Sequence, residues 1–162
     1  MVDVRSLLRS WLPVLAWMIL IFAGSSDTLS GQRTSRIIGP ILRWINPNIP
    51  QSTVDRIQLG VRKVAHLTEY AVLGALALRG LRGRRASKIS IGKLCLWAWL
   101  VCVVYASSDE WHQRFVPNRQ ASVWDVLIDS VGAGVGLCLF AWLTNRPPRE
   151  PRGATIAGSP GD

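Results

Sequence analysis

The sequence predicts an all-α, polytopic membrane protein, a bundle of four transmembrane helices. Its 162 residues are 49% hydrophobic with eight Trp and only 18% charged, which is more apolar than a soluble domain of this size requires. Four apolar stretches approach the roughly 20 residues that cross a bilayer. A single domain accommodates this length. We therefore expect one membrane domain over residues 1–143, with spans near 7–25, 61–81, 91–107 and 121–143.

The first span rests on a short apolar run, residues 11–24, which two preceding leucines extend while Arg9 reaches back to the interface. An alternative is a signal peptide, with Arg5 and Arg9 before the apolar run and a cleavage site in the small residues 23–25. Both interpretations leave the orientation of the later spans unchanged.

The other three spans differ in where their polar residues lie. The second has a polar beginning and a clean apolar run over residues 70–78, the third is dense in Leu, Val and Trp, and the fourth begins with Asp125 and Asp129. The link from Arg82 to Lys93 holds five basic and no acidic residues, which places it in the cytoplasm together with both termini. The polar ends of spans two, three and four then share the extracytoplasmic side.

The segments outside the spans carry their own predictions. Residues 144–162 are rich in Pro, Gly and Arg, and we expect a disordered cytoplasmic tail. The loop of residues 25–60 holds four arginines, which weighs against an external position. Within it, residues 33–45 place five apolar side chains on one helical face, as in an interfacial amphipathic helix, although Gly39 and Pro40 weaken the pattern. An irregular loop over the mouth of the bundle is the alternative.

Composition and motifs also exclude some functions. The net charge of +9 is spread between apolar stretches and forms no aromatic-laced basic patch, so nucleic acid is not an expected partner. Cys95, Cys102 and Cys138 lie in apolar segments without CxxC spacing, which indicates buried thiols instead of a disulfide or zinc framework. Gly132 and Gly136 have the small-xxx-small spacing of closely packed transmembrane helices.

Ionisable residues gather at the polar ends of the three later spans. They are Lys63, His66, Glu69 and Tyr70; Asp109, Glu110, His112 and Gln113; and Asp125 and Asp129. Spacings of three and four place the members of each group on one helix face. Asp125 and Asp129 would repel each other unless a cation, a shared proton or Arg119 lay between them. Intramembrane charges are costly, about 2.5–3.5 kcal/mol each at a helix centre, so we expect them to face inward.

These residues allow several interpretations. The charges could form a salt-bridge network that only fixes helix register. Two histidines do not make a zinc site, whereas Glu69, Asp109, Asp125 and Asp129 with His66 offer mostly oxygen ligands suited to a divalent cation such as magnesium, manganese or calcium. Paired acids also occur in proton relays, but the cytoplasmic halves of the spans lack matching polar groups.

Two blocks resemble the signatures of the VanZ-like family: RKVAHLTEYAVLG at residues 62–74 and SSDEWHQRFVPNRQASVWDVLIDSVGAGVG at residues 107–136. The family pattern is matched at Lys63, His66, Glu69, Tyr70, Gly74, Asp109, Glu110, Gln113, Phe115, Pro117, Arg119, Asp125, Asp129 and Gly132. Asn118 stands where Gly is common, and Asp129 where many members carry Asn. The resemblance implies an integral protein of the bacterial cell membrane, linked through the namesake to teicoplanin resistance, with no established reaction or cofactor.

Together these features predict an extracytoplasmic-side site that binds or modifies an envelope lipid or a glycopeptide-related molecule. Lys63 and Arg119 would hold an anionic group, while His66, Glu69, Asp109 and Asp125 would supply acid or base catalysis. The other expected binding residues are Tyr70, Glu110, His112, Gln113 and Asp129. A noncatalytic membrane scaffold and an ion or proton relay are the alternatives.

Overall fold

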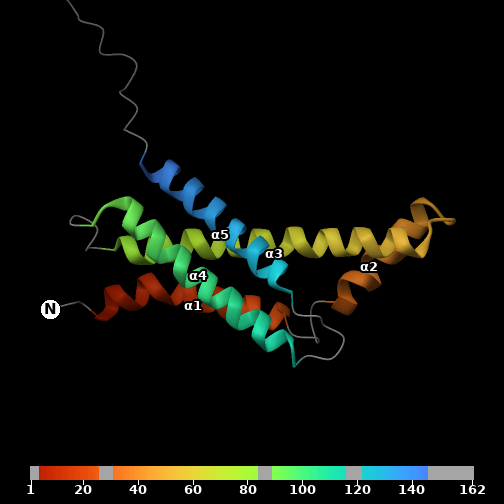
Figure 1. Ribbon diagram of the computed structural model, residues 1–162, viewed down its shortest axis with the longest axis horizontal. Coiled ribbons are helices and arrows are strands. Elements are labelled where there is room, and N and C mark those ends of the chain that lie inside the picture. Colours follow the sequence, from red (N-terminus) through yellow and green to blue (C-terminus); the bar gives the residue numbers. More distant parts are fainter. Residues whose placement is uncertain (1–3, 26–30, 84–88, 116–121, 146–162) are drawn as a thin grey trace, which may run out of the picture.

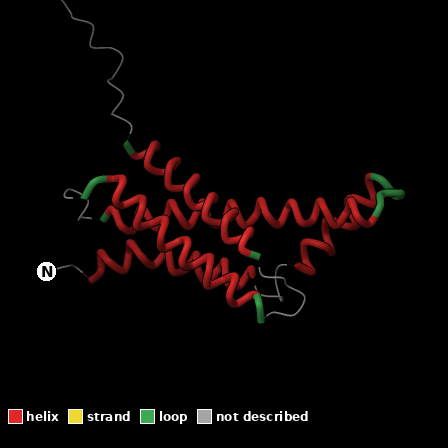
Figure 2. Tube along the Cα trace, in the orientation of Figure 1, coloured by secondary structure: helices red, strands yellow, loops and turns green. Residues whose placement is uncertain are grey.

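The structure is a computed structural model that describes residues 4–25, 31–83, 89–115 and 122–145 (Figures 1 and 2). These residues form five helices: α1 (Val4–Ser25), α2 (Gly31–Ile45), α3 (Gln51–Arg82), α4 (Ile91–Gln113) and α5 (Val123–Thr144). Helices α1, α3, α4 and α5 make the bundle, and α2 lies against the N-terminal end of α3, beyond the ends of α4 and α5 (Figure 1). The all-α prediction is confirmed.

Helix α1 belongs to the core of the bundle. Its Val14 and Ile21 side chains are buried, and the Trp17 indole Nε1 donates a hydrogen bond of 2.9 Å to the Glu69 carbonyl of α3. Gly80, near the other end of α3, lies beside the first half of α1, so the two helices run antiparallel. The helix continues unbroken through residues 23–25, where the signal-peptide alternative puts its cleavage site.

Residues 31–45 and 51–60, between the first two predicted spans, are helical and not an irregular loop. Helix α2 forms in spite of Pro40, which lacks an amide N–H and removes one hydrogen bond from the helix. Helix α3 begins at Gln51, ten residues before the predicted start of the second span. This extension packs against α2: Val54 is buried, and the Arg43 guanidinium donates to the Gln51 amide oxygen. Within α3, the Gln51 amide also donates to Asp55 at 2.8 Å.

Helices α3 and α5 run parallel and in very close contact. A Cβ added at Gly132 would meet the Leu67 carbonyl of α3, and one added at Gly136 would overlap the Ala71 carbonyl. Gly74 returns the contact, since a Cβ there would lie 2.5 Å from the Ala133 carbonyl of α5. The expected small-xxx-small packing of Gly132 and Gly136 is thus confirmed, and α3 is the helix that they approach.

Helix α4 is longer than the third predicted span. It continues from residue 107 to Gln113, carrying Asp109, Glu110, His112 and Gln113 on its last turns. Hydropathy places the end of a span where polar residues begin. In the structure, the polar side chains of Asp109, Glu110 and Gln113 are buried against neighbouring helices, so α4 continues through them.

Three helices of the described residues are long and apolar enough to cross a membrane: residues 7–25 of α1, all of α4 and all of α5. Their outer surfaces expose large apolar side chains, among them Leu12, Ile19, Trp97, Val104 and Leu139, as lipid contact requires. Helix α3 is 32 residues long but does not reach the same apolar character, because charged residues occur near both ends of its bundle portion. The chain is a multi-pass helical membrane protein.

Candidate functional site

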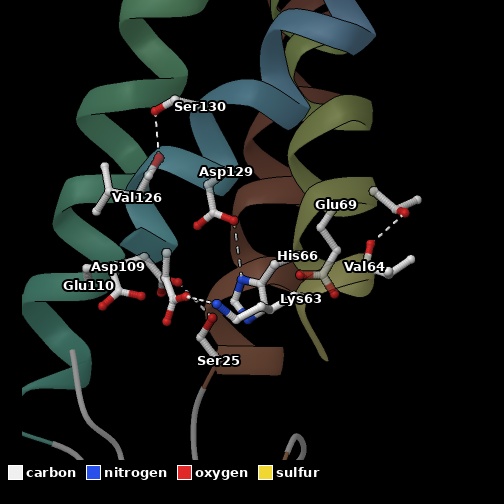
Figure 3. Close-up of polar contacts among 12 residues, drawn as sticks. Ser25, Lys63, Val64, His66, Glu69, Asp109, Glu110, Val126, Asp129 and Ser130 are labelled. Carbon is white, nitrogen blue, oxygen red and sulfur yellow. Dashed lines mark hydrogen bonds and ion pairs between the residues drawn. The ribbon is translucent and has the colours of Figure 1, made fainter. Parts of the chain in front are cut away.

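The predicted polar residues meet at one end of the bundle, where α1 and α4 end, α5 begins and α3 passes through (Figure 3). Helix α1 contributes Ser25 there, α3 contributes Lys63, His66 and Glu69, and the remaining carboxylates come from α4 and α5. This convergence follows from helix direction, because α3 and α5 run opposite to α1 and α4. Residues at the end of one pair therefore meet residues at the beginning of the other.

Asp109 is the centre of a buried hydrogen-bond network. Its Oδ2 atom accepts from the Ser25 hydroxyl at 2.8 Å (Figure 3). The same oxygen accepts from the Gln113 amide at 3.0 Å. All three side chains are buried. Two donors stabilise the carboxylate in a site that water does not surround. Ser25 was not among the predicted site residues, because a serine at the end of an apolar run carries no distinctive spacing.

Asp125 and Asp129 each face a basic side chain of α3. Lys63 Nζ lies 3.6 Å from Asp125 Oδ1, and His66 Nδ1 lies 3.7 Å from Asp129 Oδ1, an ion pair when the imidazole is protonated (Figure 3). The two pairs are stacked in the same order along both helices, as the parallel packing of α3 and α5 requires. The Lys63 ammonium reduces the repulsion between the two aspartates that their spacing predicts, and His66 does so when its imidazole is protonated.

Glu110 connects the end of α4 with the beginning of α5. Its Oε2 atom accepts a hydrogen bond of 2.9 Å from the Ser122 backbone N–H. The Ser122 hydroxyl in turn accepts from the Trp124 N–H and caps α5. This arrangement fixes the first turn of α5, and with it Asp125, relative to the carboxylates of α4.

A cavity of about 20 Å³ lies between α3, α4 and α5, with room for about one water molecule. Its lining combines charges of both signs with two apolar side chains: Arg62, Lys63, His66, Glu110, Asp125, Asp129, Leu59 and Ile128. Arg62, Leu59 and Ile128 were not predicted as site residues. Arg62 lies four residues before His66, the spacing that places two side chains on one helix face, so its position could have been inferred.

Tyr70 lies deeper in the bundle than the cavity-lining residues. Its side chain is fully buried, and among the described residues its hydroxyl has no hydrogen-bond partner. Asp109 and Asp129 lie close enough to interact electrostatically with the Tyr70 hydroxyl. One oxygen of each of these aspartates also has no hydrogen-bond partner within the described part of the chain. Three of the described helices therefore each contribute a buried polar atom without a hydrogen-bond partner to the interior of the site.

The remaining predicted residues are distributed differently. Glu69 is half-buried on α3 and close enough to act electrostatically on Asp129, but it does not line the cavity. His112 turns away from Asp109 and packs its ring against Phe22 of α1, with 4.5 Å between ring centroids. Arg119 lies outside the described residues.

The structure also bears on metal binding. Within residues 4–25, 31–83, 89–115 and 122–145, no three His, Cys, Asp or Glu side chains come together in a way that could hold a metal ion. Of the oxygen-rich set, His66, Asp125 and Asp129 line the cavity, Asp109 belongs to the buried hydrogen-bond network, and Glu69 belongs to neither. The three cysteines are free thiols.

Fold and site together define a helical integral membrane protein with a charged, partly buried cluster at one end of its bundle. The model of the VanZ/LLP1 family matches residues 10–144, and the chain belongs to this family. The match covers all five helices except the first turns of α1. No curated protein and no solved structure matches the chain.

Proposed function

We propose that this VanZ-family protein binds or modifies an envelope molecule, a lipid or a glycopeptide-related compound, at the charged end of its bundle, with one polar group of the ligand at the water-sized cavity between α3, α4 and α5. The observation that carries the proposal is the lining of this cavity, where Arg62 and Lys63 stand beside the carboxylates of Glu110, Asp125 and Asp129. A purely structural network would pair these charges and close the space between them. Here the lining leaves a cavity, with room for about one water molecule, whose charges of both signs would meet one polar group of a ligand.

The two cations are suited to an anionic group of the ligand, such as a phosphate or carboxylate. Lys63 is partly exposed, and its amine is 3.6 Å from Asp125, beyond a direct hydrogen bond, so a ligand oxygen can displace this contact. Arg119 is a further candidate from the family pattern. The carboxylates opposite would accept hydrogen bonds from hydroxyl or amino groups of the same ligand.

Acid or base chemistry would fall to His66, with Asp129 orienting its imidazole. A histidine beside a buried carboxylate can act as a general base once a hydrogen bond between the two orients the imidazole. Asp129 is only 1% exposed, and its Oδ1 atom is 3.7 Å from the imidazole Nδ1. Glu69, Asp109 and Asp125 remain candidates for acid or base roles.

The test measures the teicoplanin susceptibility of cells that produce the protein or its near-isosteric variants Asp125→Asn, Asp129→Asn and Glu69→Gln, with the membrane level of each quantified. We expect the variants to reach the membrane at wild-type levels and to lose most of the envelope phenotype. Asp55→Asn is the matched control, because Asp55 is exposed on the outer part of α3, away from the cavity. Full activity of all three site variants would refute the proposal.

The ion pairs between α3 and α5 favour one second candidate, a noncatalytic scaffold in which the charges only fix α3 against α5. The exchange Lys63→Asp with Asp125→Lys separates the two functions. It preserves the pair but reverses the direction of its charges. A scaffold should keep its activity after this exchange, whereas a site that receives an anionic group beside Arg62 should lose it.

We also propose that α3 is the fourth membrane span, with both termini and the link between α3 and α4 in the cytoplasm. The contacts between α3 and α5 extend from the pair of Lys63 and Asp125 at one end to the hydrogen bonds of Arg82 with Thr144 and Asn145 at the other. Nineteen residues of helix cover about 29 Å, close to the hydrocarbon thickness of a bilayer. If α5 crosses the membrane, α3 lies beside it over the whole depth.

A further inference from the structure

Helix α2 presents a stripe of apolar side chains that no part of the described chain covers. Ile37, Ile41, Trp44 and Ile45 follow one another at helical spacing and are exposed, Trp44 by 85% and Ile45 by 69%. The helix packs on α3 through a different face. A Cβ added at the buried Gly39 would lie 3.6 Å from the Gln58 side chain of α3. The stripe is therefore not the surface by which α2 attaches to the rest of the protein.

Basic side chains border this stripe. Arg36 and Arg43 of α2 are exposed, as is Arg56 on the adjoining part of α3. Between residues 31 and 61 the sequence holds four arginines and a single acidic residue, Asp55. An apolar stripe with a basic border is the arrangement by which a helix lies in the interface of a membrane that contains anionic lipid.

The position of α2 also favours a membrane surface. Helix α1 is a membrane span whose last residue is Ser25, and α2 begins six residues later at Gly31. Even a fully extended chain covers only about 20 Å over that interval. Helix α2 therefore begins within this distance of the point where α1 leaves the bilayer, and it lies outside the bundle (Figure 1).

We propose that α2 lies on the membrane leaflet nearest this end of the bundle, with Ile37, Ile41, Trp44 and Ile45 among the lipid chains. The arginines at its border bind the phosphates of anionic phospholipids. A second copy of the chain fits the stripe less well, because a twofold contact would bring the basic borders of two α2 helices together. This inference does not depend on the function proposed for the cavity.

The test uses spin labels on the full chain, reconstituted in vesicles of phosphatidylcholine and phosphatidylglycerol at 3:1 or of phosphatidylcholine alone. Single cysteines replace Ile41 or Trp44 in a background with Cys95, Cys102 and Cys138 changed to Ala. Asn48, in the turn after α2, is the matched aqueous control. We expect the ratio of oxygen to nickel-chelate accessibility to be several-fold higher at 41 and 44 than at 48. The difference should increase with anionic lipid and decrease in the variant Arg43→Glu with Arg56→Glu.

Three outcomes would overturn the proposal. Nickel accessibility at 41 and 44 equal to that at 48 would place the stripe in water. Low accessibility to both reagents, with spin coupling between chains, would place a second copy on it. Equal ratios of oxygen to nickel-chelate accessibility in the two vesicle compositions would show that anionic lipid does not contribute to the binding of α2. If the cysteine-free chain fails to fold, brominated phospholipid is added to the native chain and to Trp44→Phe. The native chain should lose more of its emission than Trp44→Phe, and equal losses contradict the proposal.

Discussion

At the scale of single residues, the hydrogen bond from Ser25 to Asp109 joins α1 to the candidate site. Ser25→Ala removes one of the two donors to a buried carboxylate, and we expect a loss of about 1–3 kcal/mol in the free energy of unfolding. Ser107→Ala is the matched control, because its exposed hydroxyl bonds only to the Val103 carbonyl of its own helix. Thermal unfolding of both variants in detergent tests this expectation. Equal melting temperatures would show that the bond contributes little.

The sequence predicted most of the polar residues that meet at this end of the bundle, but not all of their neighbours. Spacing placed both His112 and Gln113 beside Asp109, yet only Gln113 contacts it. A helix turns about 100° per residue, so residues three and four apart diverge by about 60° and 40° in opposite directions, and α1 lies on the side of His112. Which of the two faces the carboxylates depends on where α1 packs. Helix periodicity alone does not contain that information.

At the scale of helices, the contact of α5 with α3 determines whether the ion pairs of the site can form. Gly136→Ala would place a methyl group against the Ala71 carbonyl, and backbone atoms cannot move aside unless the helices separate. We expect the free energy of unfolding to fall by about 1–3 kcal/mol, as for other overpacked contacts. The envelope activity should fall with it. Gly134→Ala is the control, because its nearest neighbour would be the Trp99 indole nitrogen at 4.0 Å. If both variants melt at the wild-type temperature, close packing is not essential.

Hydropathy predicted the four helices of the bundle but misjudged the lengths of two. A window of apolar residues ends where charges begin, whereas a helix ends where its backbone loses its packing or its hydrogen bonds. Helix α4 continues because Asp109, Glu110 and Gln113 are buried, and α3 begins early because Val54 packs against α2. The small-xxx-small spacing in α5 was informative because only glycine permits that approach. The sequence of α5 does not indicate which helix packs against these glycines.

At the scale of the whole molecule, the alternation of helix directions makes the membrane topology testable. With α3 as a span, four crossings place both termini on the same side of the membrane, which the basic link between α3 and α4 predicts to be the cytoplasm. With only three crossings, the termini lie on opposite sides. We expect a reporter active only in the cytoplasm to work at both ends of the full chain, and alkaline phosphatase, active only outside, to work when inserted between α4 and α5. Insertion between α3 and α4 is the control, because the basic residues there predict a cytoplasmic position. Termini on opposite sides would exclude α3 as a span. The position of the charged cavity relative to the membrane would then change as well. Helix α3 contributes Lys63 and His66 to this cavity and pairs them with aspartates of α5.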